Sequence, residues 1–339
     1  MNLTKNYNKV LKKLKNKTIL ITGGAGFIGS NLCEYLLKIG AKVRCLDNLS
    51  TGNKKNISGF INNINFNFIN GDIRNIKTCQ LACEKVDFVL HQAALGSVPR
   101  SIKDPISTNE VNISGFLNML IASKDNNVKR FIYAASSSTY GDSKSLPKVE
   151  NIIGRPLSPY AITKYVNELY SEVFKKTYNL NFIGLRYFNV FGPRQDPNSA
   201  YSAVIPKFIN LLLNHQSPTI NGDGSFSRDY TYIDNVIEMN ILALTTDNKK
   251  ALNQIYNTAV GERNTLIDLI NILKKYLTNY DSEISRINPV FGSIREGDVP
   301  HSLACIKKAK KLLNYYPTND FESGIEKTIS WYVKNFKNN

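Results

Sequence analysis

The sequence has little acidic charge and no long apolar run. Asp and Glu number 27 against 43 Lys and Arg, which gives a net charge of +16. No stretch approaches the roughly eighteen apolar residues that a transmembrane helix needs, and the N-terminus lacks the apolar segment of a signal peptide. We therefore expect a cytoplasmic protein without membrane insertion.

Cysteine and histidine are also scarce, at five and three residues. The cysteines form no Cys-x-x-Cys pair, and no histidine lies near Cys79 and Cys83, the two that are four residues apart. A metal site is therefore not expected. The odd cysteine count is typical of reduced thiols in a cytosolic protein.

The positive charge is spread along the chain, with a local concentration at residues 5–17. The sequence has no zinc-finger spacing, RNP motif or RGG-like tract, which disfavours a dedicated nucleic-acid-binding protein. A positive field of this kind suits an anionic metabolite such as a diphosphate.

Residues 1–16 predict an amphipathic helix, because their apolar side chains recur at helical spacing and lysines occupy the other positions. The favoured interpretation is a helix packed on the protein's own body. The alternative is a peripheral membrane contact, which one such helix would make only weakly.

Short apolar segments alternate with helical patterns over the first 190 residues. The predicted strands are Lys17–Thr22, Lys42–Leu46, Asn65–Ile69, Val86–Leu90, Lys129–Ala135 and Asn181–Arg186. A helix is expected from Phe27 to Ile39, with Gly40 as its C-terminal cap. This alternation predicts an α/β fold, a doubly wound parallel sheet of the Rossmann type.

After Phe188 the pattern becomes irregular, with several prolines and an Asn-Gly-Asp-Gly turn at 221–224. We predict a nucleotide-binding domain at residues 17–188, to which the chain returns around 229–260. Residues 189–339 are predicted to form a smaller mixed α/β region that binds the substrate.

A glycine turn follows the first predicted strand and opens the first predicted helix. Gly23, Gly26 and Gly29 are spaced for a dinucleotide-binding turn, with Phe27 and Ile28 between the last two. Such glycines let a pyrophosphate approach the backbone at a helix N-terminus. The turn therefore predicts a bound dinucleotide.

Asp47 lies about twenty residues beyond this turn, where a carboxylate accepts hydrogen bonds from the ribose hydroxyls. A carboxylate also repels a 2′-phosphate, so NAD is favoured over NADP. Asn48 is expected beside it, and Arg44 is expected to point away to solvent.

Two further segments follow the third and fourth predicted strands. Asp72 is a candidate for the adenine amino group, with Ile73 beside the ring, although a helix N-cap is an open alternative for Asp72. Gln92, Ala93 and Ala94 are predicted to let the backbone approach the cofactor.

Tyr160 and Lys164 are one helical turn apart, so their side chains share a face. Tyrosine has a pKa near 10 and is a poor base at neutral pH, but a nearby ammonium favours the phenolate. The pair therefore predicts oxidation of an alcohol, with Tyr160 as the base.

A serine cluster, Ser136 to Ser138, ends the fifth predicted strand at the edge where α/β sheets bind ligands. Ser136 is our choice for the catalytic hydroxyl because it precedes Tyr140 by four positions. Ser138 is a second candidate for this role. Ser137 and Ser138 are also candidates for substrate binding.

Together the segments TGGAGFIGS, DNLSTG, GDIR, HQAALGSV, SSSTYG, YAITK and RYFNVFGPRQDP resemble the extended short-chain dehydrogenase/reductase family. The likeness covers nearly the whole chain. It is strongest to the UDP-sugar 4-epimerases, and among them to the bacterial UDP-N-acetylglucosamine 4-epimerases of surface-polysaccharide (O-antigen or Vi-type) synthesis.

The resemblance implies C4 epimerisation of a UDP-hexose with NAD through a 4-keto sugar. Lys164 would bind the nicotinamide ribose, and Tyr187 and Phe188 would border the nicotinamide. The substrate-binding residues that it implies are Ser97, Ser137, Ser138, Asn189, Gln195, Ala203, Val204, Lys207, Asn221, Arg228, Arg295 and Ser302. It also implies a homodimer built through a four-helix bundle.

Ser302 is small, and in this family a bulky residue there is associated with non-acetylated sugars. We therefore expect UDP-GlcNAc and UDP-GalNAc, or their uronic acid forms. The alternatives are a UDP-glucose or UDP-glucuronate 4-epimerase, a nucleotide-sugar dehydratase or decarboxylase, and a non-enzymatic binding module. The serine cluster lacks the carboxylates that a dehydratase or decarboxylase would use, and the intact Tyr160–Lys164 pair disfavours a binding module.

Overall fold

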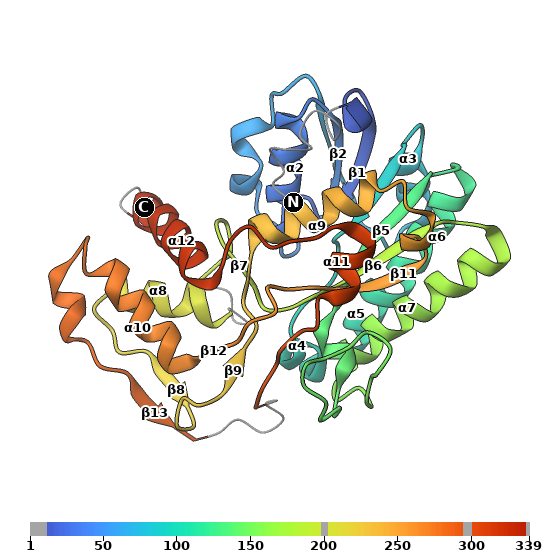
Figure 1. The fold of residues 1–339 in the computed structure, drawn as a ribbon. Coiled ribbons are helices and arrows are strands. Elements are labelled where there is room, and N and C mark those ends of the chain that lie inside the picture. The colour runs from blue at the N-terminus through green and yellow to red at the C-terminus, as the bar shows by residue number, and fades with distance from the viewer. Residues whose placement is uncertain (1–11, 198–202, 294–299, 337–339) are drawn as a thin grey trace.

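The computed structural model describes residues 12–197, 203–293 and 300–336. Its centre is a seven-stranded, fully parallel sheet in the order β11-β6-β5-β4-β1-β2-β3 (Figure 1). The strands are β1 (Thr18–Thr22), β2 (Lys42–Asp47), β3 (Phe66–Asn70), β4 (Phe88–His91), β5 (Arg130–Ser136), β6 (Phe182–Tyr187) and β11 (Gln254–Thr258). The predicted Rossmann-type sheet is confirmed.

The six predicted strands all form, with ends within two residues of those expected. Their apolar residues are buried on both faces of the sheet, which is why they read as continuous apolar runs. The seventh strand, β11, was not predicted, because its sequence, QIYNT, has too few apolar residues to form a recognisable buried-strand pattern.

Helices cover both faces of the sheet. On one face lie α2 (Phe27–Lys38) and α9 (Ile233–Thr245), and on the other α3 (Ile76–Cys83), α6 (Phe116–Asp125) and α7 (Pro159–Tyr178). Helix α2 ends where predicted, because Gly40 adopts a positive φ of 79° directly after the cap.

Three shorter helical segments connect β4 to α6. They are α4 (Val98–Lys103), α5 (Pro105–Asn109) and a π-helical turn, η3 (Glu110–Gly115), which runs directly into α6. Helix α7 packs against α4, α5 and η3. These segments therefore form one helical layer beside the carboxyl end of the sheet.

The C-terminal half adds a smaller mixed region, on the left of Figure 1. It contains one parallel strand pair, β8 with β13, and one antiparallel pair, β9 with β12. Its elements are α8 (Val204–Leu213), β8 (Thr219–Asn221), β9 (Ser227–Arg228), β12 (Asn264–Thr265), α10 (Leu266–Leu277), β13 (Val290–Gly292) and α12 (Phe321–Phe336). A further parallel pair, β7 (Val190–Phe191) with β10 (Thr231–Tyr232), leads into it, and α11 (Lys307–Leu313) packs near β11.

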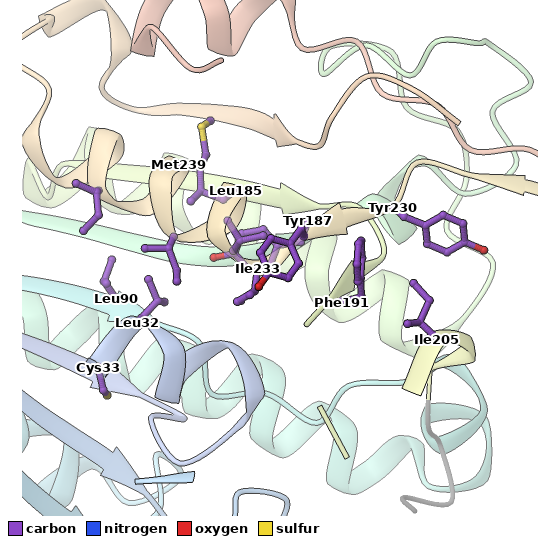
Figure 2. Close-up of a cluster of buried hydrophobic side chains, with 14 of the residues drawn as sticks. Leu32, Cys33, Leu90, Leu185, Tyr187, Phe191, Ile205, Tyr230, Ile233 and Met239 are labelled. Atoms are coloured by element: carbon purple, nitrogen blue, oxygen red, sulfur yellow. The ribbon is translucent and has the colours of Figure 1, made fainter. Parts of the chain in front are cut away.

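One apolar core joins the sheet to this region. It extends from Leu32 on α2 and Leu90 on β4, through Tyr187 and Phe191, to Ile205 on α8 (Figure 2). Because this core is continuous, the two parts hold each other in a defined orientation.

Residues 1–11 of the predicted N-terminal helix lie outside the described residues. In the part that is described, Leu14 is buried in the core and Lys13 forms an ion pair with Asp247. All five cysteines are free, as expected. No helix in the described ranges is both long and apolar enough to cross a bilayer.

Candidate active site

From β1 the sheet continues through β2 and β3 on one side and through β4, β5 and β6 on the other, so β1 and β4 form the topological switch point. A cavity of about 320 Å³ opens at the carboxyl ends of these strands. Twelve predicted cofactor residues line it: Gly23, Gly26, Phe27, Ile28, Gly29, Asp47, Asn48, Asp72, Ile73, Gln92, Ala93 and Ala94. Seven other lining residues were not predicted: Leu46, Ser50, Thr51, Gly71, Leu95, Gly96 and Val111. Six of them lie in or shortly after the ends of β2, β3 and β4, and Val111 lies in the π-helical turn.

The glycine turn is closed too tightly for side chains. A Cβ on Gly29 would lie 2.1 Å from the carbonyl oxygen of Gly23, and Gly23 itself has φ +68°. The turn places the N-terminus of α2 against the cavity, where backbone N–H groups and the helix dipole favour an anion. A pyrophosphate therefore fits this edge.

Asp47 ends β2 and is almost fully buried at the cavity wall. Its Oδ2 accepts from the backbone N–H of Ala25 at 2.9 Å, and its Oδ1 accepts from that of Leu49 at 2.7 Å. A carboxylate oxygen accepts up to two hydrogen bonds, so each keeps capacity for a ribose hydroxyl. Gln92 Nε2, also at this wall, is buried without a partner among the described residues. Both features fit a dinucleotide.

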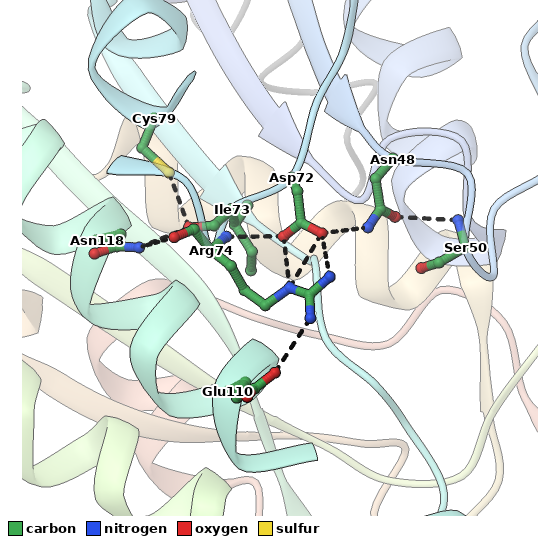
Figure 3. A network of polar contacts seen from close by, with 8 residues as sticks. All are labelled: Asn48, Ser50, Asp72, Ile73, Arg74, Cys79, Glu110 and Asn118. Atoms are coloured by element: carbon green, nitrogen blue, oxygen red, sulfur yellow. Dashed lines mark hydrogen bonds and ion pairs between the residues drawn. The ribbon is translucent and has the colours of Figure 1, made fainter. Parts of the chain in front are cut away.

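Asp72, which also lines the cavity, lies at the centre of a polar network (Figure 3). Arg74 donates to both carboxylate oxygens, and Asn48 Nδ2 donates to Oδ2 at 2.9 Å. The hydrogen bonds from Arg74 lower the pKa of Asp72 to about 2. The alternative role of helix N-cap for Asp72 is wrong, because Asn75 caps α3.

The expectation that Arg44 points to solvent is wrong. Its guanidinium donates to the carbonyl oxygens of Ala82 and Glu84, both at 2.8 Å, at the C-terminus of α3. The last carbonyls of a helix have no partner within it. Arg44, on β2, satisfies two such carbonyls, a contact between segments that no local pattern indicates.

Tyr160 and Lys164 lie in the first two turns of α7, whose N-cap Ser158 accepts from Ala161 N–H and whose first residue is a proline. Lys164 is buried, and its Nζ donates to the carbonyl oxygen of Ala134 on β5 at 2.8 Å. The same Nζ lies 5.9 Å from the centre of the Tyr160 ring. The two side chains therefore meet, as their spacing indicates.

Burial acts on both groups. It lowers the pKa of Lys164 to about 8, and it raises the pKa of Tyr160 above its ordinary value, while a hydrogen bond with Ser136 acts in the opposite direction. At Tyr160 the effect of burial therefore outweighs that of the hydrogen bond with Ser136. A phenolate needs additional positive charge nearby, which an oxidised nicotinamide carries.

Within the serine cluster the structure distinguishes the three hydroxyls. Ser136 Oγ accepts from both the N–H and the Oγ of Ser138, at 3.1 and 2.9 Å, and it contacts Tyr160. Ser138 thus reaches Tyr160 only through Ser136. The two residues form a short hydroxyl chain that ends at the phenol, whereas Ser137 makes no contact of this kind with the described residues.

Asn112 in the π-helical turn was missed by the sequence analysis. Its Oδ1 accepts from Leu95 N–H at 2.8 Å, and its Nδ2 donates to Leu95 O and to Thr163 Oγ1. Thr163 directly precedes Lys164, so Asn112 ties the cavity loop to the helix that carries Tyr160. A single asparagine in a helical pattern gives no indication of such a linking role.

Tyr187 contacts the cavity indirectly. Its hydroxyl donates to Oε1 of Gln92 at 3.1 Å and accepts from Asn240. Phe188 is buried against Tyr140, behind the serine cluster, with ring centres 6.0 Å apart.

The predicted substrate residues lie on several separate elements. Ser97 caps α4, Asn189 donates to the carbonyl of Asp229, and Gln195 donates to that of Val190. Ala203 caps α8, which carries Val204 and Lys207, and Asn221 ends β8.

Arg228 and Ser302 lie on two segments that the structure brings together. Arg228 Nη1 donates to Pro300 O at 3.0 Å, and Ser302 N–H donates to Ser227 O at 3.0 Å. His301, between them, contacts Ser227 Oγ through Nδ1. Arg295 lies outside the described residues.

Comparison with known proteins agrees with this arrangement. A model of the NAD-dependent epimerase/dehydratase family matches residues 19–259. A curated relative, the putative UDP-glucose 4-epimerase of Methanocaldococcus jannaschii, is 36% identical over 94% of this chain and 99% of its own length.

Two solved structures are similar as well. UDP-N-acetylglucosamine 4-epimerase of Methanobrevibacter ruminantium, in complex with UDP-N-acetylmuramic acid, has a TM-score of 0.88 and 39% identity, covering 95% of this chain and 100% of that one. UDP-glucuronic acid 4-epimerase of Bacillus cereus, with UDP-glucuronic acid and NAD, has a TM-score of 0.84 and 32% identity, covering 94% and 99%. The chain belongs to the NAD-dependent epimerase/dehydratase family.

Proposed function

We propose that this protein is an NAD-dependent UDP-sugar 4-epimerase whose preferred substrates are UDP-GlcNAc and UDP-GalNAc or their uronic acid forms. The observation that carries the proposal is the hydroxyl chain from Ser138 through Ser136 to Tyr160, with Lys164 buried beneath the phenol. It provides a path for one proton and no carboxylate for further elimination.

The reaction requires these side chains to remove a proton from the C4 hydroxyl and to return one to the same oxygen. Tyr160, with Ser136 holding the sugar oxygen, takes the proton of the C4 hydroxyl as the carbonyl forms, and later returns a proton to the same oxygen. NAD, which the glycine turn and Asp47 would hold, would supply the acceptor for the C4 hydride and the donor for its return. Lys164 stabilises the phenolate, since its ammonium lies near the ring.

A dehydratase is the alternative within the family. It would need an acid and a base beside the reacting carbons to eliminate water, and this chain has only hydroxyls at Ser136, Ser137 and Ser138. Tyr160 alone must serve both half-reactions. This supports epimerisation, in which the same proton and hydride return to the sugar.

The segment with Arg228 and Ser302 supports the choice of sugar. Arginine binds phosphate bidentately, and Arg228 directly follows Ser227, whose carbonyl accepts from Ser302 N–H. The small Ser302 side chain leaves room for an N-acetyl group. The name of the similar protein from Methanobrevibacter ruminantium, UDP-N-acetylglucosamine 4-epimerase, also supports this choice of substrates.

A UDP-glucose or UDP-glucuronate 4-epimerase is the second candidate, because other relatives carry those names. Incubating the enzyme separately with the UDP derivatives of Glc, GlcNAc, GlcA and GlcNAcA, and comparing kcat/KM, distinguishes the candidates. The proposal expects the highest value for an acetylated sugar. A higher value for UDP-glucose or UDP-glucuronate would reject the N-acetyl preference, and absence of any epimer would reject the function.

Ser302→Tyr should reverse this preference. A tyrosine adds an aromatic ring where the N-acetyl group is expected, and steric exclusion from a pocket typically costs about 1–3 kcal/mol, or roughly 10–200-fold in kcat/KM. Turnover of UDP-GlcNAc should fall by that factor while that of UDP-glucose changes little. Ser302→Ala is the matched control, and an equal loss on both sugars would count against this role.

We also propose that the protein forms a homodimer through α7. Phe116 and Leu120 on α6 are buried in the protein's own core. The exposed apolar row lies instead on α7, where Ile162, Leu169 and Val173 are 50%, 45% and 53% exposed and share one helical face. This face points away from Lys164, so pairing would leave the site open.

Leu169→Glu should convert the dimer into a monomer, because it places a charge at the centre of this apolar row. Light scattering coupled to size exclusion measures the mass. Ile64→Glu, at a residue that is 98% exposed in a loop, is the control and should stay dimeric. A wild-type protein that is monomeric at micromolar concentration would refute the proposal.

A further inference from the structure

Asp229 is a fully buried carboxylate that the proposed mechanism does not use. It lies between β9 and β10, directly after Arg228, and its side chain accepts three backbone hydrogen bonds. The N–H of Val260 donates to Oδ1 at 3.0 Å, and those of Gly261 and Ala304 donate to Oδ2 at 3.0 and 3.2 Å. One carboxylate therefore joins three segments that are far apart in the sequence.

The first two bonds hold the connection between the central sheet and the smaller region. Val260 and Gly261 lie between β11, in the sheet, and β12, in the smaller region (Figure 1). Gly261 has φ +87°, a conformation in which a side chain would be strained. Strand β12 then pairs with β9, where Asn264 is the register partner of Arg228. Asp229 thus fixes the end of the strand pair that carries Arg228.

The third bond holds the segment that carries Ser302. Ser302 N–H donates to Ser227 O at 3.0 Å, and two residues later Ala304 N–H donates to the carboxylate of Asp229. The segment therefore runs alongside residues 227–229 and is attached to them at two points. The position of Ser302 relative to Arg228 depends on both attachments.

The backbone of Asp229 makes a further contact with a predicted substrate residue. Its carbonyl oxygen accepts from Asn189 Nδ2 at 3.0 Å, and Asn189 O in turn accepts from Thr231 N–H at 3.3 Å. Three predicted substrate residues, Asn189, Arg228 and Ser302, are thus each held through Asp229 or its immediate neighbours.

A carboxylate suits this place better than any other side chain of its size. Burial raises the pKa of Asp229 to about 7, and the three backbone hydrogen bonds act in the opposite direction by favouring the charged form. An apolar side chain would avoid the cost of burial but would leave three N–H groups without this acceptor. An asparagine has one acceptor oxygen and would turn its own N–H₂ group toward an N–H donor.

We propose that Asp229 is a positioning residue of the substrate site, whose carboxylate fixes Arg228 and the segment carrying Ser302 relative to each other. The inference rests on the proposed function, in which these residues bind the diphosphate and the sugar of a UDP-sugar. Asp229 acts through its neighbours, so its loss should weaken substrate binding and leave the chemistry and the NAD content intact.

The first test is Asp229→Asn, measured on the NAD-loaded enzyme. KM for UDP-GlcNAc and the calorimetric Kd for UDP should both rise roughly tenfold, the equivalent of one hydrogen bond to a charged group, with little change in kcat. Glu262→Gln, which removes an exposed carboxylate from the same connection, is the control and should bind UDP as the wild type does. A lower unfolding temperature with unchanged Kd and KM would show a purely structural role and overturn the proposal.

A double-mutant cycle tests whether Asp229 acts through Arg228. UDP affinity is compared among wild type, Arg228→Ala, Asp229→Asn and the variant with both substitutions. If Asp229 positions the arginine, its substitution should cost much less affinity once the guanidinium is absent. Fully additive losses would overturn the proposal.

Ala304→Pro gives a second variant that leaves the carboxylate in place, in case Asp229→Asn does not fold. Proline has no N–H, so this change removes only the bond to the segment with Ser302. KM for UDP-GlcNAc should rise by a larger factor than the Kd for UDP, because the segment contacts the sugar rather than the diphosphate. Unchanged values for both would overturn the proposal.

Arg228→Ala alone separates this inference from the proposed function. Weaker UDP binding in Arg228→Ala, with none in Asp229→Asn, rejects the positioning role and keeps the diphosphate contact. Unchanged UDP binding in Arg228→Ala rejects the proposed diphosphate contact, and the positioning role falls with it.

Discussion

Replacement of Tyr160 by phenylalanine should lower kcat by about 10²–10⁴-fold, the usual contribution of one positioned acid–base group. The ring and its packing on α7 remain, but the oxygen that takes the C4 hydroxyl proton is lost. Because Ser136 contacts this oxygen, the hydroxyl chain then ends without a base. KM for the UDP-sugar should change little, since the phenol contributes to the transition state more than to binding.

The measurement is the initial rate of UDP-GlcNAc to UDP-GalNAc conversion, followed together with the amount of NAD that co-purifies. Tyr165→Phe, a half-buried tyrosine on the same helix, is the control and should keep wild-type turnover and NAD content. If Tyr160→Phe keeps turnover within about tenfold of wild type, another residue must be the base.

Lys164→Met should have an effect of similar size, about 10²–10⁴-fold on kcat, because the phenolate loses its ammonium. Methionine is unbranched and fills the channel of the lysine stem. Lys164 is buried and donates to the carbonyl of Ala134, so the substitution also removes that hydrogen bond. Lys176→Met, at an exposed position of α7, is the control and should behave as wild type.

The pH dependence gives an additional signature. Burial lowers the pKa of Lys164 to about 8, so the ammonium is present below this pH and lost above it. Burial raises the pKa of Tyr160, so its phenolate is favoured as pH rises. Wild-type kcat/KM should therefore pass through a maximum and fall above about pH 8. Lys164→Met should lack the alkaline decline, and its persistence would assign that titration to a different group.

Much of the site could be predicted because its motifs are local. The glycine turn requires three glycines at fixed spacing, and the Tyr160–Lys164 pair requires only that residues 160–164 be helical. Asp47 follows its strand directly, so its position relative to the turn depends on β1 and β2 being neighbours. Parallel strands with a short crossover helix satisfy that condition almost automatically.

The contacts that sequence reasoning missed all join distant segments. Arg44 reaches the end of α3, and Asn112 links the cavity loop to Thr163. The sequence around Arg44 and around Asn112 gives no indication of these contacts. Ser136 was chosen from its spacing to Tyr140, but its adjacency to Tyr160 depends on how α7 crosses the end of β5.

The sequence by itself determined the first six strands of the sheet, the dinucleotide turn and the spacing of the catalytic pair, because these depend on residues within one or two helical turns of each other. Only the tertiary structure decided which hydroxyl contacts Tyr160 and which face of α7 is exposed. These depend on side chains that meet across the sheet, where burial sets both their partners and their protonation.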